Sequence, residues 1–253
     1  MRIDAHAHVS TPGGDDPWAA DRLLLEAADA LEIDYLCCSS LSSLRPATPE
    51  AFRACNEHLH RTIEHFGDRI LGYCYVNPGY QKEAVAEIRH CIEDFGFIGV
   101  KLYNEYKVTD PAVRPVLEIC IELDVPILHH AGHTWWPLPG QPNISDAADM
   151  GRVLVQYPEL KLIYGHICGG GDWEWTLRAL RDAPGLYADT SGSVVDEGVI
   201  EKAVEMVGVE RLVFACDMSM TAGVGKLLAA DISESDREMI FSGNMRRLLG
   251  GRI

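Results

Sequence analysis

Short, almost continuous apolar runs recur along this chain, and a longer stretch with apolar residues at helical spacing follows each run. Apolar runs without alternation are typical of strands that are buried on both faces, as in a parallel sheet. The strands predicted from these runs span residues 1–9, 35–39, 70–76, 97–103, 125–130, 160–166, 186–191 and 211–216. The predicted helices span 18–31, 49–66, 81–95, a segment beginning at 110, one ending near 157, 172–181, 196–207 and 233–249.

Strand and helix thus alternate eight times within 253 residues, which predicts a (β/α)8 TIM barrel in a single domain covering residues 1–253. The alternative is an open, doubly wound sheet. That fold would need a glycine-rich phosphate loop directly after a strand, and Gly169, Gly170 and Gly171 lack the spacing of such a loop. We therefore expect the closed barrel, with an active site at the carboxyl ends of the strands.

The first predicted strand carries two histidines, His6 and His8, framed by the apolar Ile3 and Val9. Residues two apart in a strand point to the same face, so both imidazoles could share one cation. A purification tag would show a longer histidine run without an apolar frame. The pair is therefore a candidate part of a metal site.

Polar residues also close the other predicted strands, and the barrel would bring them to one rim. They are Lys101, Tyr103, His129, His130, His166, Asp189, Ser191 and Asp217. Histidines buried only for packing would be scattered along the strands instead of gathered at one end. The grouping therefore predicts a site where ligands from separate strands converge.

Composition excludes some classes of partner. The formal net charge is −16, and binding to nucleic acid or to an anionic membrane needs an excess of lysine and arginine. No apolar run approaches the roughly 20 residues of a membrane span, and no signal peptide is recognised. The eight cysteines contain no Cys-X-X-Cys pair and fall mostly on apolar positions, as reduced, buried cysteines do. We expect a cytoplasmic protein that binds a small-molecule substrate, and a homo-oligomer such as a dimer stays open.

Several motifs, in this order along the chain, carry a resemblance to a known family. They are Ile3-Asp4-Ala5-His6-Ala7-His8, Gly99-Val100-Lys101-Leu102, Ile127-Leu128-His129-His130-Ala131-Gly132, Tyr164-Gly165-His166, Leu186-Tyr187-Ala188-Asp189-Thr190-Ser191-Gly192, Phe214-Ala215-Cys216-Asp217 and Asn244. With them the chain resembles the amidohydrolase superfamily, in the amidohydrolase-related branch that contains aminocarboxymuconate-semialdehyde decarboxylase and γ-resorcylate decarboxylase.

The resemblance implies a divalent metal held by His6, His8, Asp217 and a histidine of the fifth strand. It also implies that His166 is a further ligand or a catalytic acid/base. Alignment of His-Ala-Gly with the family pattern makes His130 the ligand, and strand alternation then turns His129 toward the helix layer. Neutral imidazoles with one carboxylate suit Zn2+, which we expect first, or Mn2+.

The remaining candidates concern the substrate. Lys101 could be carboxylated to bridge two metals, as in some relatives, or bind a substrate carboxylate, and we favour a single metal. Arg45 is a candidate for gripping a carboxylate with two parallel bonds. Tyr103, Trp135 and Trp136 are candidates for the substrate wall.

Four further histidines lie on predicted helices and are expected at the solvated surface. They are His58, His60, His65 and His90.

Two functions fit this ligand set. The first is hydrolysis of a small amide, ester or lactone by metal-activated water, with Asp217 and His166 as the catalytic residues. The second is non-oxidative decarboxylation of a small unsaturated or aromatic carboxylic acid. One cation can serve either reaction, so the sequence leaves both open.

Overall fold

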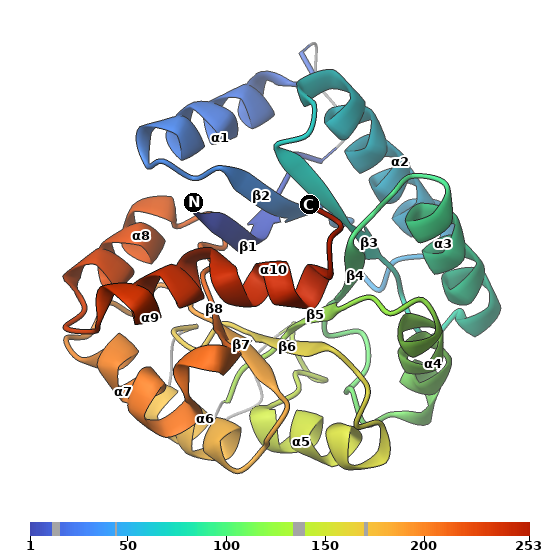
Figure 1. Cartoon of the computed structure of the whole chain (residues 1–253). Helices are drawn as coiled ribbons and strands as arrows, with labels where there is room; N and C mark the ends of the chain where they lie inside the picture. The colour runs from blue at the N-terminus through green and yellow to red at the C-terminus, as the bar shows by residue number, and fades with distance from the viewer. Residues whose placement is uncertain (12–15, 44, 134–139, 170–171) are drawn as a thin grey trace.

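Eight parallel strands form one sheet in chain order within the part of the chain that the structure covers (Figure 1). The computed structural model describes residues 1–253 except 12–15, 44, 134–139 and 170–171. The strands are β1 Ile3–His8, β2 Tyr35–Ser39, β3 Ile70–Tyr75, β4 Gly99–Leu102, β5 Ile127–His130, β6 Leu162–Gly165, β7 Tyr187–Asp189 and β8 Leu212–Val213. The amide of Ala5 donates to the carbonyl of Phe214 at 2.9 Å, and that of Asp217 donates to His6 at 2.8 Å. These bonds close the sheet into the predicted (β/α)8 TIM barrel.

Helices surround this sheet and alternate with the strands (Figure 1). They are α1 Ala19–Ala30, α2 Pro49–Phe66, α3 Gln81–Glu93, α4 Arg114–Glu122, α5 Ala147–Gln156, α6 Trp173–Arg181, α7 Val199–Val207, α8 Met220–Ala229, α9 Glu234–Glu238 and α10 Asn244–Leu249. The predicted caps of α2 are present, because Thr48 accepts a hydrogen bond from the Ala51 amide and Gly67 ends the helix at φ 80°. No helix of the described residues is long and apolar enough to cross a membrane.

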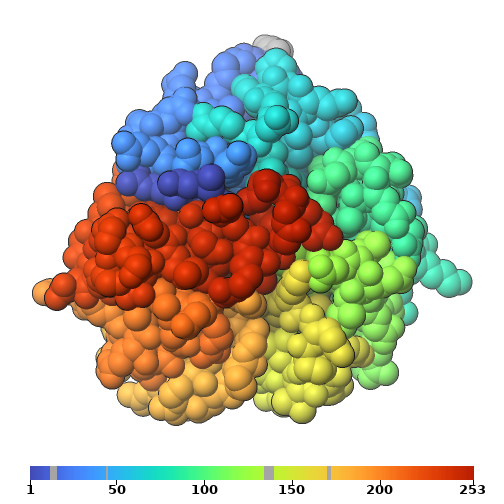
Figure 2. Space-filling view, viewed as in Figure 1, coloured from blue at the N-terminus to red at the C-terminus, as the bar shows by residue number. Residues whose placement is uncertain are grey.

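The C-terminal segment closes one end of the barrel. Helix α10 lies across the ends where the strands begin, and Figure 2 shows this segment in red over the middle of that face. Its Met245 and Leu248 join one apolar cluster with Ile3, Leu128 and Val213 from the barrel interior. The opposite end, where the strands finish, is therefore the end available for a site.

Some predicted boundaries were wrong. The helix predicted over 233–249 consists of α9, a π-helical turn at Met239–Gly243 and α10. Helix α8 was missed, because Gly223 and Gly225 weaken the helical pattern. A Cβ on Gly223 would lie 2.8 Å from the Cys216 sulfur, so the close packing of α8 on the chain after β8 requires glycine there.

The surface expectation for the helical histidines was partly wrong. His58 is buried, because its ring stacks on Trp18 with 5.7 Å between centroids, and His60 is half-buried against Phe95. His65 and His90 are exposed as expected. All eight cysteines are free and buried, as predicted from their apolar positions.

Candidate metal centre

Two histidines and a carboxylate meet at the carboxyl ends of the barrel strands. His8 Nε2 lies 3.1 Å and His6 Nε2 3.7 Å from Asp217 Oδ1. Among the described residues, His6, His8 and Asp217 form a group whose potential ligand atoms all lie within 4.8 Å of one another. The first and last strands of the barrel thus bring together side chains that the sequence places more than two hundred positions apart.

Local irregularities of the backbone aim these side chains. The register between β1 and β2 shifts between Asp4 and Ala7, so Ala5 packs in the barrel interior and Ala7 in the outer layer. His6 and His8 flank Ala7 and point to the mouth together. Asp217 has φ 44°, a left-handed conformation that non-glycine residues adopt at an energetic cost and that recurs at functional sites.

The far nitrogen of each histidine has an oxygen partner. Asp189 Oδ2 lies 2.8 Å from His6 Nδ1, and because a carboxylate can only accept, the proton of His6 sits on Nδ1. Ser39 places its hydroxyl 2.9 Å and its carbonyl 3.3 Å from His8 Nδ1, and both oxygens can accept from it. This arrangement leaves a lone pair on His6 Nε2 and allows one on His8 Nε2, as ligation of a metal requires.

Charge in the site follows from burial. Burial is the main cause that lowers the pKa of His6 and of His8, so both imidazoles are neutral. Burial raises the pKa of Asp217, but the contacts with His8, His6 and His166 outweigh it and hold that pKa well below its usual range. Two neutral imidazoles and one carboxylate are a donor set that fits a divalent cation.

Lys101 of β4 contacts the group of His6, His8 and Asp217 through His6. Its side chain is fully buried, and its Nζ donates to His6 Nε2 at 2.5 Å. An ammonium group can only donate, which agrees with a lone pair on His6 Nε2. Burial lowers the pKa of Lys101 to about 8.

His166 follows β6 with φ 74° and lies beside the same group. Its Nδ1 lies 2.8 Å from the Ser191 hydroxyl and 3.5 Å from Asp217 Oδ2, and its backbone amide donates to Asp189 Oδ1 at 2.8 Å. Burial lowers the pKa of His166. From the sequence, Asp189 and Ser191 are expected only to lie at the rim. In the structure, Asp189 contacts His6 and Ser191 contacts His166.

The two histidines of β5 face opposite ways, as strand alternation predicts. His129 is buried opposite Leu102 and Tyr164, which belong to the outer apolar layer, and its Nδ1 donates to the His130 carbonyl at 2.7 Å. His130 turns to the mouth, where its Nδ1 lies 2.9 Å from His166 Nε2. It contacts His166 and does not belong to the group of His6, His8 and Asp217.

The rim carries the substrate candidates. Tyr103 stacks on His130 with 4.2 Å between centroids, and the guanidinium of Arg45 lies 3.6 Å from the centre of the Tyr103 ring. Arg45 is exposed, and its Nε donates to the Ser42 carbonyl at 3.4 Å. The candidates Trp135 and Trp136 lie outside the described residues.

Asp4 ties the first strand to the last. Its Oδ1 accepts from the amides of His6 at 3.0 Å and Cys216 at 2.9 Å, and burial raises its pKa to about 7. It thereby links the backbone that carries His6 to the backbone that carries Asp217.

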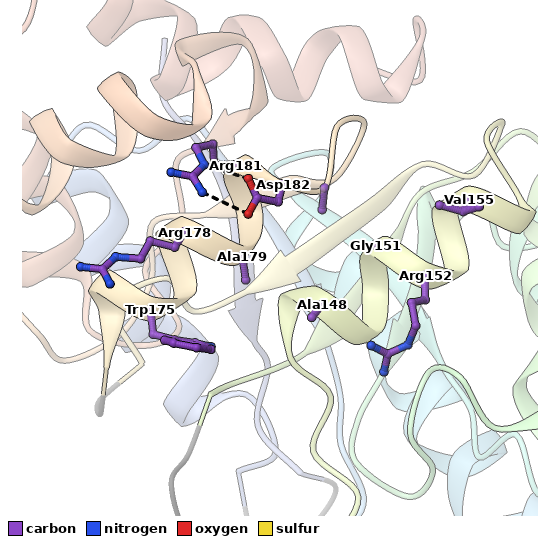
Figure 3. Close-up of a pocket in the computed structure, with 10 residues that line it drawn as sticks. Ala148, Gly151, Arg152, Val155, Trp175, Arg178, Ala179, Arg181 and Asp182 are labelled. Atoms are coloured by element: carbon purple, nitrogen blue, oxygen red, sulfur yellow. Dashed lines mark hydrogen bonds and ion pairs between the residues drawn. The ribbon is translucent and has the colours of Figure 1, made fainter.

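A groove of about 620 Å³ lies elsewhere, on the outer layer between α5 and α6 (Figure 3). Trp175, Arg178 and Arg181 of α6 line one side, and Arg152 and Val155 of α5 line the other. None of the candidate ligands lines this groove, so the candidate metal centre is assigned to the barrel mouth and not to the groove.

The chain is similar to several known enzymes. The family model "Amidohydrolase" matches residues 3–251. The chain is 26% identical over 239 residues to a 2-keto-4-carboxy-3-hexenedioate hydratase of Sphingobium sp. strain SYK-6, covering 78% of this chain and 70% of the relative. It is 23% identical over 249 residues to a γ-resorcylate decarboxylase of Polaromonas sp. strain JS666, covering 79% and 76%.

A solved structure of a dihydroxybenzoic acid decarboxylase from Polaromonas sp. JS666 superposes with a TM-score of 0.74 at 18% identity, covering 99% of this chain and 97% of that one. That structure contains manganese and the inhibitor 2-nitroresorcinol. The family match spans nearly the whole chain and includes every strand of the barrel. The chain belongs to the amidohydrolase family of enzymes.

Proposed function

We propose that this protein is a metal-dependent decarboxylase of a small aromatic or unsaturated carboxylic acid. The observation that carries the proposal is the convergence of His6, His8 and Asp217 at the barrel mouth, with the proton of His6 held on the far nitrogen by Asp189. The decarboxylase among the relatives supports the choice of reaction.

The proposed ligands are His6, His8, His130 and Asp217, with His166 beside them. His130 contacts His166 at the mouth, and in the metal-bound protein it would turn from His166 toward the cation. A bound divalent cation would supply positive charge to the substrate carboxylate and to a neighbouring oxygen. The manganese in the Polaromonas structure supports Mn2+ as the first cation to test, and Zn2+ is the second.

Arg45 is the proposed anchor for a substrate carboxylate at the rim. Its guanidinium is exposed and lies over the Tyr103 ring, and it offers a planar fork of donors able to bind a carboxylate with two parallel bonds. Tyr103 in turn stacks on His130, so the aromatic wall leads from the rim to the proposed ligands. An unsaturated, flat acid fits such a wall.

Asp217 and His166 are the residues proposed to handle the proton. When the carboxyl group leaves as carbon dioxide, its electron pair stays on the substrate carbon, and a proton must replace the lost group there. Asp217 Oδ2 lies 3.5 Å from His166 Nδ1, so both side chains stand beside the mouth, where the Asp217 carboxyl or His166 Nε2 could deliver that proton. Lys101 is proposed to add positive charge beneath the substrate.

Hydrolysis of a small amide, ester or lactone is the second candidate. The same donor set would serve it, because His6, His8 and Asp217 would hold a divalent cation, which would supply Lewis acidity to a water molecule. Asp217 would then accept a proton from that water.

The deciding experiment loads chelator-treated protein with Mn2+ and offers it hydroxybenzoic acids, unsaturated dicarboxylic acids, lactones and esters. Release of carbon dioxide from an acid, lost on chelation and in Asp217→Asn, supports the proposal. Asp182→Asn, an exposed carboxylate outside the site, is the matched control and should keep the wild-type rate. Chelator-sensitive turnover of lactones or esters without carbon dioxide release would contradict the decarboxylase proposal and favour the hydrolase. Addition of water to an unsaturated acid would instead favour a hydratase.

A cytoplasmic location is also proposed. All eight cysteines are buried and unpaired, which suits a reducing compartment.

A further inference from the structure

A buried lysine of α8, Lys226, holds the loop that follows β7. Its Nζ donates to the carbonyls of Thr190 at 2.9 Å and Gly192 at 3.0 Å, and only 9% of the residue is exposed. None of the described carboxylates forms an ion pair with it. Burying an ammonium group is costly unless acceptors surround it, so hydrogen bonds to these two carbonyls are needed to offset the burial of Lys226.

The two carbonyls flank Ser191, and the backbone there is tightly confined. Gly192 has φ 114°, and a Cβ at this position would lie 2.0 Å from the Cys168 carbonyl oxygen. The Ser191 amide donates to Asp189 Oδ1 at 2.9 Å. Lys226 therefore fixes a turn whose central side chain faces the mouth.

The hydroxyl of Ser191 determines which nitrogen of His166 carries the proton. Ser191 Oγ donates to Asp189 Oδ1 at 2.6 Å, and its single hydrogen is thereby used. The 2.8 Å contact between Ser191 Oγ and His166 Nδ1 then needs a proton from the imidazole. His166 carries it on Nδ1, and Nε2 keeps its lone pair.

The same reasoning extends to His130. Because His166 Nε2 accepts, His130 Nδ1 at 2.9 Å must donate, and His130 Nε2 is left without a proton. The structure places Gln141 Oε1 3.2 Å from that nitrogen, so this series requires the Gln141 amide to be rotated by half a turn, which brings its nitrogen there as the donor. Every donor in this series points from the mouth toward Asp189, which also accepts from His6.

We propose that Lys226 is a positioning residue for His166: by binding the carbonyls on either side of Ser191, it holds the hydroxyl that keeps the His166 proton on Nδ1. In this state Nε2 of His166 is the atom that can take a proton at the mouth. The tautomer is a property of the metal-free chain, whereas its effect on turnover rests on the proposed function.

The test is 15N NMR of histidine-labelled, metal-free protein, in which protonated and unprotonated imidazole nitrogens resonate far apart. His166→Gln identifies the signals. We expect the wild type to show a protonated Nδ1 and an unprotonated Nε2, and Lys226→Met and Ser191→Ala to show a mixture of both tautomers. Lys226→Arg, which can still donate to two carbonyls, should restore the wild-type pattern.

Arg211→Met separates positioning from simple stabilisation. Arg211 also donates to two backbone carbonyls, but these belong to Leu180 in α6 and Ala183 just after it, away from Ser191. It should lower the melting temperature and leave the His166 signals unchanged. If Ser191→Ala and folded Lys226→Met both keep the wild-type signals, or if the wild type carries its proton on Nε2, the proposal is overturned. Should Lys226→Met fail to fold, Ser191→Ala and Lys226→Arg decide.

Turnover provides a second readout. We expect kcat to fall about 10–100-fold in Lys226→Met, with KM within about twofold of the wild type. A protein that shows the expected tautomers but decarboxylates no acid would contradict the proposed function and leave this inference standing. An unchanged kcat in an active enzyme would contradict the role of Lys226.

Discussion

Replacing Asp189 by asparagine should cost more free energy in metal binding than in folding. Asp189 is fully buried and accepts hydrogen bonds from His6 Nδ1, from the His166 and Ser191 amides and from the Ser191 hydroxyl, at 2.6–2.9 Å. In Asp189→Asn the oxygen can still serve the amides, but an NH2 group replaces the acceptor facing His6. His6 must then accept at Nδ1 and carry its proton on Nε2, the atom that faces Asp217 and that accepts from Lys101 in the wild type, so the Lys101 ammonium must also move away.

The magnitudes of the two effects differ. Changing a carboxylate partner behind a ligand histidine costs about 10–100-fold in metal affinity. That factor corresponds to about 1.4–2.7 kcal/mol of binding free energy. Exchanging a charged for a neutral hydrogen bond costs about 1 kcal/mol of folding free energy, because the His6 contact re-forms with the opposite polarity. The variant should therefore stay folded.

Isothermal titration of Mn2+ into chelator-treated protein measures the first effect, and urea unfolding of the metal-free protein measures the second. Asp182→Asn, exposed and paired with Arg181, is the control and should match the wild type in both. A folded Asp189→Asn protein that binds Mn2+ within about twofold of the wild type would refute the reasoning from tautomers.

Three further predictions concern the mouth. Asp217→Asn should reduce turnover at least about 100-fold while the circular dichroism melting curve stays near that of the wild type; a variant that keeps most of its rate would remove Asp217 from the mechanism. Arg45→Ala should raise KM for acid substrates about 10-fold with little change in kcat, measured by initial rates; an unchanged KM would exclude the rim anchor. Gly192→Ala should lower the free energy of unfolding by more than about 2 kcal/mol, because its Cβ would meet the Cys168 carbonyl, whereas Gly185→Ala, also at positive φ but with nothing within 4 Å, should cost less. Urea unfolding of both variants compares them, and equal losses would contradict the steric argument.

The barrel could be predicted because each buried strand leaves a local apolar run, and the breaks between runs fall at caps such as Thr48 and Gly67. Helix α8 could not, since Gly223 is required by contact with Cys216, which the local pattern does not record. His58 is expected at the surface from the sequence because it lies on a predicted helix. The ring of Trp18, which covers it, comes from another part of the chain.

The placement of the site histidines at the mouth follows from strand position alone, and alternation correctly separates His130 from His129. The role of Asp189 is different. Its partner His6 lies 183 positions away, and nothing in the local sequence states which carboxylate stands behind which imidazole. Lys226 was missed for the same reason, since its acceptors are backbone carbonyls that any sequence could supply.

The central claim is that one cation binds between the first and last strands of the barrel. Anomalous diffraction from crystals soaked in Mn2+ tests it most directly. The account predicts a strong peak within bonding distance of His6 Nε2, His8 Nε2 and Asp217, with the Lys101 ammonium displaced from His6. Saturating Mn2+ with no peak at the mouth, or a peak bound only by other side chains, would contradict it.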